Sequence, residues 1–276
     1  MPEALVCDAM SLPGAYYETD RVRIYNARCE DILPRFVDRA FTHAIMDPPY
    51  SDHVHTNTRT NKGTDGASGG EEIELGFGHL TPALRALVAH HVRRLVTRWG
   101  LTFCDVESSH LWRRDLCGED RWRVDEQEMA AHEYLRTGIW LKGGAMPQVT
   151  GDRPGSGYES IVITHGPRAR GDGRTRWNGG GKSNVWRAPV PQRRDGRVHP
   201  SEKPWRLIAQ LLRDFTDEGD VILDPFAGSG PLGRAVLDVP GRRAVLIEAD
   251  EQWCAQAASR LGAPVPETNG QAGLQW

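Results

Sequence analysis

Residues 221–250 read VILDPFAGSGPLGRAVLDVPGRRAVLIEAD, and this stretch decides the fold. Its apolar run Val221–Asp224 is typical of a buried strand, and the glycine-rich turn that follows leads into a helix over 231–237. A second strand over 244–248 and a helix over 250–261 complete the unit. Strands that alternate with helices in this way indicate a doubly wound α/β fold with a mostly parallel sheet.

The turn inside this unit, DPFAGSG at 224–230, has the features of a ligand site. Gly228 and Gly230 allow the backbone to approach a ligand at the carboxyl edge of a parallel strand. Glu248 ends the next strand, about 20 residues further on, where a carboxylate can accept hydrogen bonds from ribose hydroxyls. Two glycines alone would favour a tight turn without a ligand, but the strand, the aspartate and the spaced acid together favour a site; neither a dinucleotide-binding nor a P-loop pattern is present. The candidate ligand-binding residues of this unit are Asp224, Pro225, Phe226, Gly228, Ser229, Gly230 and Glu248.

A second candidate site is the tetrapeptide Asp47-Pro48-Pro49-Tyr50, which follows an apolar strand over 40–47. Proline cannot continue a strand ladder, so the pair stops the strand and fixes the direction of its carbonyls. An exocyclic base amine is a poor nucleophile because its lone pair is delocalised into the ring. The Asp47 carboxylate and the Pro48 carbonyl could accept its two N–H bonds and localise that lone pair, while Tyr50 stacks on a base taken out of the duplex. The simpler alternative is a rigid turn that only ends the strand.

Composition limits the class of the protein. At 276 residues, with 39% hydrophobic and 26% charged residues, the chain is typical of a globular protein. The formal net charge of −3 restricts any polyanion site to a local patch. Five cysteines without a CxxC pair indicate neither a disulfide framework nor a zinc ribbon. Because the N-terminal residues do not resemble a signal peptide and no apolar run approaches membrane-spanning length, a cytoplasmic protein without membrane contact is expected.

The rest of the chain shows neither an internal repeat nor a linker, which predicts a single domain over 1–276. Thr81 and Pro82 open a strong amphipathic helix that Gly100 is expected to end. Residues 201–204 open another helix with its apolar side chains inward. One or two helical turns are expected over 31–36, and further strands are expected over 22–25, 101–106, 137–141 and 158–164.

Two segments are poor in apolar residues and are predicted to contact a substrate. The first, over 51–78, is long for a loop in a compact domain, and its position after the tetrapeptide indicates an inserted lid over the reacting base. The second, over 165–198, is basic and glycine-rich, and residues 168–206 contain eleven lysines and arginines against three acids. Such a stretch can neutralise phosphates, although by composition alone a solvated loop is an equal interpretation. His53 and His55 lack a third ligand, so no metal site is expected. The candidate DNA-binding residues are His53, Arg59, Lys62, Arg168, Arg170, Arg174, Arg176, Lys182, Arg193, Arg194 and Arg197.

Four features in this order resemble the β-group of amino DNA methyltransferases. They are the Asp-Pro-Pro-Tyr tetrapeptide, the basic region, HPSEKP at 199–204 and DPFAGSG at 224–230. The resemblance covers most of the chain. It implies a Rossmann-like fold that binds S-adenosyl-L-methionine. It also implies a site-specific enzyme that methylates the N6 amine of adenine in duplex DNA by base flipping.

The same resemblance assigns roles to further residues. HPSEKP is similar to the family's His-Pro-Thr-Gln-Lys-Pro segment, which lines the methionine end of the cofactor, and this implies contacts from Ser201 and Lys203. Glu248 matches the family's ribose-binding acid. The family's Gly-Asp near the cofactor adenine is replaced here by Asn-Ala-Arg-Cys-Glu-Asp at 26–31, which makes Asp31 the candidate adenine contact.

The resemblance leaves alternatives open. Cytosine-N4 members more often have Ser-Pro-Pro-Tyr, so Asp47 favours adenine, and a cytosine-N4 enzyme is the nearest alternative. RNA and protein-glutamine methyltransferases also use Asn/Asp-Pro-Pro-Tyr, but with the cofactor loop first in the sequence. A DNA-binding relative without catalysis is a different class, against which Asp47, Tyr50, Asp224 and Glu248 argue. Double-stranded DNA is the expected partner, and a homodimer and a cognate restriction endonuclease of a restriction-modification pair are further candidates.

Overall fold

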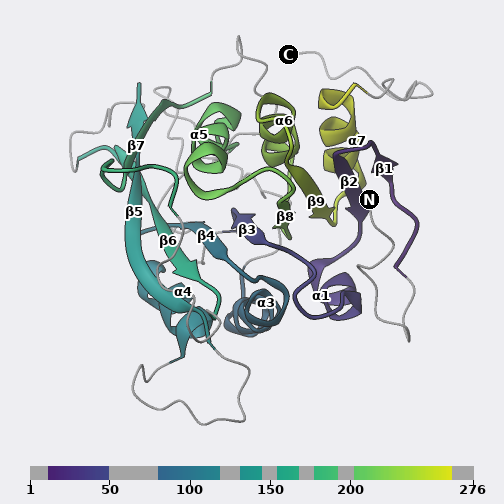
Figure 1. Ribbon diagram of the computed structural model, residues 1–276, viewed down its shortest axis with the longest axis horizontal. Coiled ribbons are helices and arrows are strands. Elements are labelled where there is room, and N and C mark those ends of the chain that lie inside the picture. Colours follow the sequence, from purple (N-terminus) through teal and green to yellow (C-terminus); the bar gives the residue numbers. More distant parts are fainter. Residues whose placement is uncertain are drawn as a thin grey trace, which may run out of the picture.

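The structure is a computed structural model, and it describes residues 12–49, 80–118, 131–144, 154–167, 177–191 and 202–262. These residues build one mixed, mostly parallel sheet with helices on both faces (Figure 1). The strand order across the sheet is β1-β2-β9-β8-β3-β4-β6-β5-β7. The strands are β1 (Tyr17–Glu18), β2 (Val22–Asn26), β3 (His43–Met46), β4 (Trp99–Cys104), β5 (Glu133–Gly143), β6 (Tyr158–His165), β7 (Val185–Pro189), β8 (Val221–Asp224) and β9 (Arg243–Glu248).

Five neighbouring strands form the parallel part of the sheet. β2, β9, β8, β3 and β4 pair in parallel in that order, while β6 runs antiparallel to both β4 and β5, and β7 is parallel to β5. The predicted doubly wound α/β fold with a mostly parallel sheet is therefore confirmed. Because parallel strands end at the same edge, the residues that follow β3, β8 and β9 meet there.

Helices cover both faces of the sheet, which explains why the central strands are buried on both sides. In Figure 1, α5 (Trp205–Phe215), α6 (Pro231–Asp238) and α7 (Glu251–Arg260) lie on one face. On the other face are α1 (Cys29–Ile32), α3 (Pro82–Leu95) and α4 (Ser109–Cys117), and a 3-10 turn, η2 (Leu33–Arg35), follows α1. The two faces have separate apolar clusters, and alternate residues of β3 enter them: Ile45 packs with α5–α7, and Met46 with α1–α4.

Local sequence signals fix several element ends. The Thr81 side chain accepts a hydrogen bond from the Leu84 N–H, and Pro82 begins α3 as predicted. The prediction that Gly100 ends this helix was wrong, because α3 ends at Leu95 and Gly100 lies inside β4. A Cβ atom at Gly100 would lie 2.6 Å from Thr164 Oγ1 on the paired strand, so glycine serves close strand packing there.

The basic region was expected to be irregular, yet it contains a strand. β7 alternates exposed and buried side chains from Val185 to Pro189, and Trp186 and Ala188 face the core. None of the helices in the described ranges combines the length and the apolar character that crossing a membrane requires.

Candidate functional site at the carboxyl edge of the sheet

Three acids stand at the carboxyl ends of three neighbouring parallel strands. Asp47 follows β3, Asp224 ends β8 and Glu248 ends β9. The structure thus brings together the two candidate sites that the sequence separates by more than half of the chain. Asp224 is only 4% exposed. Burial raises its pKa well above the usual value, and the nearby charges of Asp47 and Glu248 raise it further.

The glycine-rich loop between β8 and α6 is held to the sheet by its own backbone. The Phe226 N–H donates to Asp224 Oδ1 at 3.0 Å, and the Ala227 N–H donates to the Ile247 carbonyl at 3.0 Å. Gly228 and Gly230 both have positive φ, 51° and 75°, a conformation that favours glycine. The Asp224 side chain, the hydrogen bond to β9 and the two glycines therefore determine the conformation of the loop.

The two glycines of this loop have different surroundings. A Cβ atom at Gly230 would lie 2.7 Å from the Ala257 Cβ, so this glycine lets α6 start against α7. A Cβ atom at Gly228 would meet no atom of the described residues within 4 Å. On the side where a side chain would lie, Gly228 therefore has no neighbour among the described residues, so a ligand could approach its backbone from that side.

Glu248 joins this loop to the start of α7. Its Oε2 accepts the Gly228 N–H at 2.8 Å, and its Oε1 accepts the Asp250 N–H at 2.9 Å. Burial raises the pKa of Glu248, and these backbone N–H groups oppose the rise. Each carboxylate oxygen has a further lone pair, so Glu248 can accept hydroxyl hydrogens at the strand end.

Asp47 is held at the end of β3 by a lysine from a distant segment. Lys203 Nζ lies 2.8 Å from Asp47 Oδ2, and the Lys203 side chain is only 2% exposed. Burial raises the pKa of Asp47 to about 6, and Lys203 opposes this rise. Directly after β3, Pro48 is buried and Pro49 is half-buried.

Lys203 also contacts a second carboxylate. Its Nζ is 3.1 Å from Glu159 Oε2 on β6, and Glu159 Oε1 is 2.8 Å from Lys142 Nζ on β5. Asp47, Lys203, Glu159 and Lys142 therefore form a row of alternating charges. Sequence analysis missed Glu159 and Lys142 because both lie on strands outside the recognised motifs, and only the sheet pairing brings them to Asp47.

Glu202, the residue before Lys203, contacts the glycine-rich loop. Glu202 accepts two hydrogen bonds from Arg260 of α7, at 2.8 Å and 2.7 Å, and a third from Ser229 Oγ at 3.1 Å. The segment before α5 therefore contacts Asp47 through Lys203 and the glycine loop through Glu202. Arg260 was not predicted, since a lone arginine in the last turn of a helix gives no functional signal.

Besides Lys182, the remaining predicted residues divide into two groups. Asp31 is exposed on α1, which follows β2 at the same sheet edge, and beside it Asn26 donates to the carbonyls of Glu248 and Ala249 at 3.2 Å and 3.0 Å. The other group lies outside the described residues and comprises Tyr50, His53, Arg59, Lys62, Arg168, Arg170, Arg174, Arg176, Arg193, Arg194, Arg197 and Ser201.

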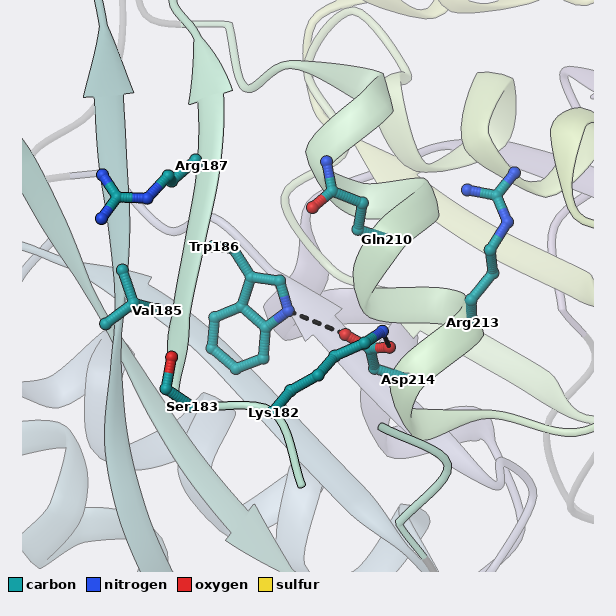
Figure 2. Close-up of a pocket in the computed structure, with 8 residues that line it drawn as sticks. All are labelled: Lys182, Ser183, Val185, Trp186, Arg187, Gln210, Arg213 and Asp214. Atoms are coloured by element: carbon teal, nitrogen blue, oxygen red, sulfur yellow. Dashed lines mark hydrogen bonds and ion pairs between the residues drawn. The ribbon is translucent and has the colours of Figure 1, made fainter. Parts of the chain in front are cut away.

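Lys182 does not join the carboxyl edge. It precedes β7, which is parallel to the central strands, and so lies toward the opposite, amino edge. Figure 2 shows its side chain directed at Asp214 near the end of α5, and the two charged groups are 2.6 Å apart. Trp186 Nε1 donates to the other oxygen of Asp214 at 2.9 Å. An open pocket of about 400 Å³ lies between β7 and α5 at this point.

Known proteins resemble this chain in sequence over limited stretches. The type II methyltransferase M.XycI from Xanthomonas campestris pv. cyanopsidis is 35% identical over 156 residues, which are 54% of this chain and 51% of the relative. The type II methyltransferase M2.DpnII from Streptococcus pneumoniae is 44% identical over 71 residues, 26% of each chain. The chain thus spans about half or less of the length of the curated relatives it matches.

Solved structures share the fold. The crystal structure of the M1.HpyAVI–SAM complex matches 87% of this chain and 100% of its own, with a TM-score of 0.59 and 19% identity. The PvuII DNA methyltransferase, described as cytosine-N4-specific, matches 89% of this chain and 88% of its own, with a TM-score of 0.63 and 13% identity. At these identities the likeness shows a common α/β architecture.

The family model for N6/N4 DNA methylases matches residues 119–259, just over half of the chain. The matched stretch includes Lys203, which contacts Asp47, and Glu159, which contacts Lys203. It also includes the glycine-rich loop and Glu248 at the same sheet edge. The chain belongs to the N6/N4 DNA methylase family.

Proposed function

We propose that this protein transfers a methyl group from S-adenosyl-L-methionine to an exocyclic amine of a base in double-stranded DNA. One observation carries the proposal. Asp47, whose carboxylate can accept hydrogen bonds from an amine, lies at the same sheet edge as the Gly228 backbone and Glu248, which can bind a nucleoside. Membership of the N6/N4 DNA methylase family supports both halves of this assignment.

The residues around the glycine-rich loop fit the cofactor. Glu248 would accept the ribose hydroxyls, and the open backbone at Gly228 would lie against the ligand. Phe226, a half-buried residue of the loop, offers an apolar surface. When bound, S-adenosyl-L-methionine supplies an electrophilic methyl group on a positively charged sulfur. Asp31, exposed on α1, remains the candidate contact for the cofactor adenine.

Asp47 would prepare the nucleophile. Its Oδ1 and the Pro48 carbonyl would accept the two N–H groups of the target amine, which localises the nitrogen lone pair toward the methyl donor. The carboxylate form of Asp47 is the stronger acceptor, because a protonated carboxyl carries an O–H donor and accepts only through its remaining lone pairs. The amine lies inside the stack in duplex DNA, so the target base must leave the helix, and Tyr50 is the expected stacking partner.

The N6 amine of adenine is the favoured target. Asp47 stands where cytosine-N4 members more often have serine. The fold itself does not separate the two, since the cytosine-N4-specific PvuII enzyme shares it. Cytosine-N4 methylation is therefore the second candidate.

Nucleoside analysis tests the proposal. Purified protein is incubated with radiolabelled S-adenosyl-L-methionine and duplex DNA of mixed sequence, and the DNA is digested to nucleosides. Label in N6-methyl-2′-deoxyadenosine supports the proposal, whereas label in N4-methyl-2′-deoxycytidine favours the second candidate. Label that enters no base, under conditions where the cofactor binds, would overturn the methyltransferase assignment.

A further inference from the structure

Lys203 is the most deeply buried charged group at the carboxyl edge that the proposed reaction leaves unused. Its side chain is 2% exposed, and its ammonium lies between Asp47 Oδ2 at 2.8 Å and Glu159 Oε2 at 3.1 Å. The Phe103 ring of β4 lies below it, with its centroid 5.6 Å from Nζ. A buried ammonium needs opposite charges, and two carboxylates from different strands supply them here.

We propose that Lys203 is a positioning residue that keeps Asp47 in its carboxylate form and directs Oδ1 of Asp47 toward the target amine. This inference rests on the proposed methyl transfer to an amine. Glu159 and Lys142 hold Lys203 in place, since Glu159 binds Lys203 through one oxygen and Lys142 through the other.

The two carboxylate oxygens of Asp47 have different surroundings. Oδ2 is occupied by Lys203, and the described part of the chain gives Oδ1 no hydrogen bond. The Asp47 side chain is 29% exposed, so it lies open to the surface while Lys203 is enclosed. An amine can therefore reach Asp47 without displacing Lys203, and the ion pair fixes the carboxylate plane before the base arrives.

Electrostatics explains why Asp47 needs a cation. The pKa of Asp47 is raised to about 6 as the net result of several effects. Burial raises it most, Lys203 lowers it, Glu159 raises it, and Lys142 lowers it. Among the described residues, the other ionisable groups that interact electrostatically with Asp47 are Asp224 on β8 and the Cys104 thiol on β4, and neither supplies positive charge. Without Lys203, Asp47 would share this edge with Glu159 and Asp224, and its pKa would rise further.

The neighbouring residue couples this role to the cofactor loop. Glu202 is bound by Arg260 and Ser229, while Lys203 binds Asp47. The two side chains thus tie one short segment to both halves of the site. In the family resemblance Lys203 contacts the cofactor, whereas in the structure its ammonium faces the carboxylate that would bind the base.

The test uses the full chain with Lys203→Met, which keeps length and removes charge, and Lys203→Arg, which keeps charge. Lys182→Met is the matched control, because Lys182 also pairs with a buried aspartate but at the amino edge. The pKa of Asp47 is read by NMR from its carboxyl carbon, assigned by comparison with Asp47→Asn. We expect Lys203→Met to raise this pKa by about one pH unit or more, and Lys203→Arg and Lys182→Met to leave it near the wild-type value.

The second measurement is the pH dependence of the single-turnover rate of methyl transfer. The rate should fall as pH drops through the pKa of Asp47, and Lys203→Met should move this acidic limb to higher pH. At pH 5, below the wild-type pKa of about 6, the rate should fall about tenfold for each pH unit by which the limb moves, and the difference should shrink above pH 7. Affinity for S-adenosyl-L-methionine should stay within about twofold of wild type because Lys203 contacts Asp47 rather than the cofactor loop.

Different outcomes overturn different claims. An unchanged Asp47 pKa in Lys203→Met, or weaker cofactor binding with an unchanged pH profile, contradicts the positioning role. If wild-type protein methylates no DNA, the proposed function fails, while the NMR titration still decides the link between Lys203 and Asp47. If Lys203→Met does not fold, Lys203→Gln, which is neutral and keeps hydrogen-bond donors, must show the same rise in the pKa of Asp47.

Discussion

The paired strands β3 and β8 carry polar residues at both ends, and the two ends differ. At the amino edge, His43 Nε2 lies 2.7 Å from Asp220 Oδ2, which also accepts from the Asp217 N–H at 2.7 Å and from Arg98 at 3.1 Å. Burial pushes the pKa of Asp220 up, but these partners outweigh it and the pKa ends below the usual value. The Asp220 carboxylate is therefore held by three groups of the protein itself.

At the carboxyl edge, burial changes the pKa values of the acids more than their partners do. The pKa values of Asp47, Asp224 and Glu248 are all raised, because each acid has fewer partners than its burial demands. A fold that keeps three such acids at one edge stores unfavourable electrostatic energy there, which is typical of a functional site. We infer that the amino edge of β3 and β8 stabilises the fold, and we propose that the carboxyl edge carries out the chemistry.

The largest expected effect is on catalysis at the carboxyl edge. Asp47→Ala should lower the rate of methyl transfer by about a hundredfold or more, since the amine loses its main acceptor. The free energy of unfolding should change little. Radiolabel transfer to DNA and urea denaturation measure the two quantities. The control is Asp38→Ala, at an exposed aspartate in a surface ion pair with Arg94; a rate for Asp47→Ala equal to this control would refute the role of Asp47.

At the amino edge the opposite pattern is expected. Asp220→Ala should lower the free energy of unfolding by about 3 kcal/mol, because His43 loses its buried acceptor and Arg98, which also pairs with Asp217, loses Asp220. The folded fraction should still transfer methyl groups at nearly the wild-type rate. Urea denaturation followed by circular dichroism gives the stability. Unchanged stability in Asp220→Ala would show that this cluster is not structural.

The two glycines of the loop provide a matched pair. Gly230→Ala should destabilise the protein by about 2 kcal/mol more than Gly228→Ala, since only the Gly230 Cβ would meet Ala257. Both variants share the strain of positive φ. Gly228→Ala should instead weaken binding of S-adenosyl-L-methionine. Thermal melts and isothermal titration separate the two effects, and equal losses of stability would argue against the assignment.

The smallest expected effect is on the ribose contact. Glu248→Gln should weaken binding of S-adenosyl-L-methionine about tenfold, because a charged acceptor becomes a neutral one. Glu251→Gln, an exposed glutamate on α7, is the control and should bind as wild type does. Isothermal titration measures both affinities. If the two variants bind equally well, Glu248 does not hold the ribose.

The structure was predictable from the sequence where it depends on one continuous segment. The strand, turn and helix at 221–238 follow from local apolar periodicity and two glycines, and β9 with α7 follows from the same pattern. Parallel strands end together, so placing Asp47, Asp224 and Glu248 at strand ends was enough to bring them to one edge.

Long-range side-chain pairing was not predictable. Lys203 binds Asp47 across 156 residues of sequence, and Arg260 binds Glu202 across 58. No periodic pattern encodes such contacts, which depend on how the sheet edge and α7 pack. β7 was missed for a related reason: its five residues include Arg187 and Pro189, and only the burial of Trp186 and Ala188 reveals the alternation.

Amide NMR with added S-adenosyl-L-methionine tests most directly the claim that function lies at the carboxyl edge. The Gly228 and Asp250 N–H groups donate to Glu248 at that edge, and the Trp99 and Asp217 N–H groups donate to His43 and Asp220 at the other. The expected result is that the Gly228 and Asp250 signals move with saturation, while the Trp99 and Asp217 signals stay in place. Movement at the amino edge with unchanged Gly228 and Asp250 signals would contradict the claim.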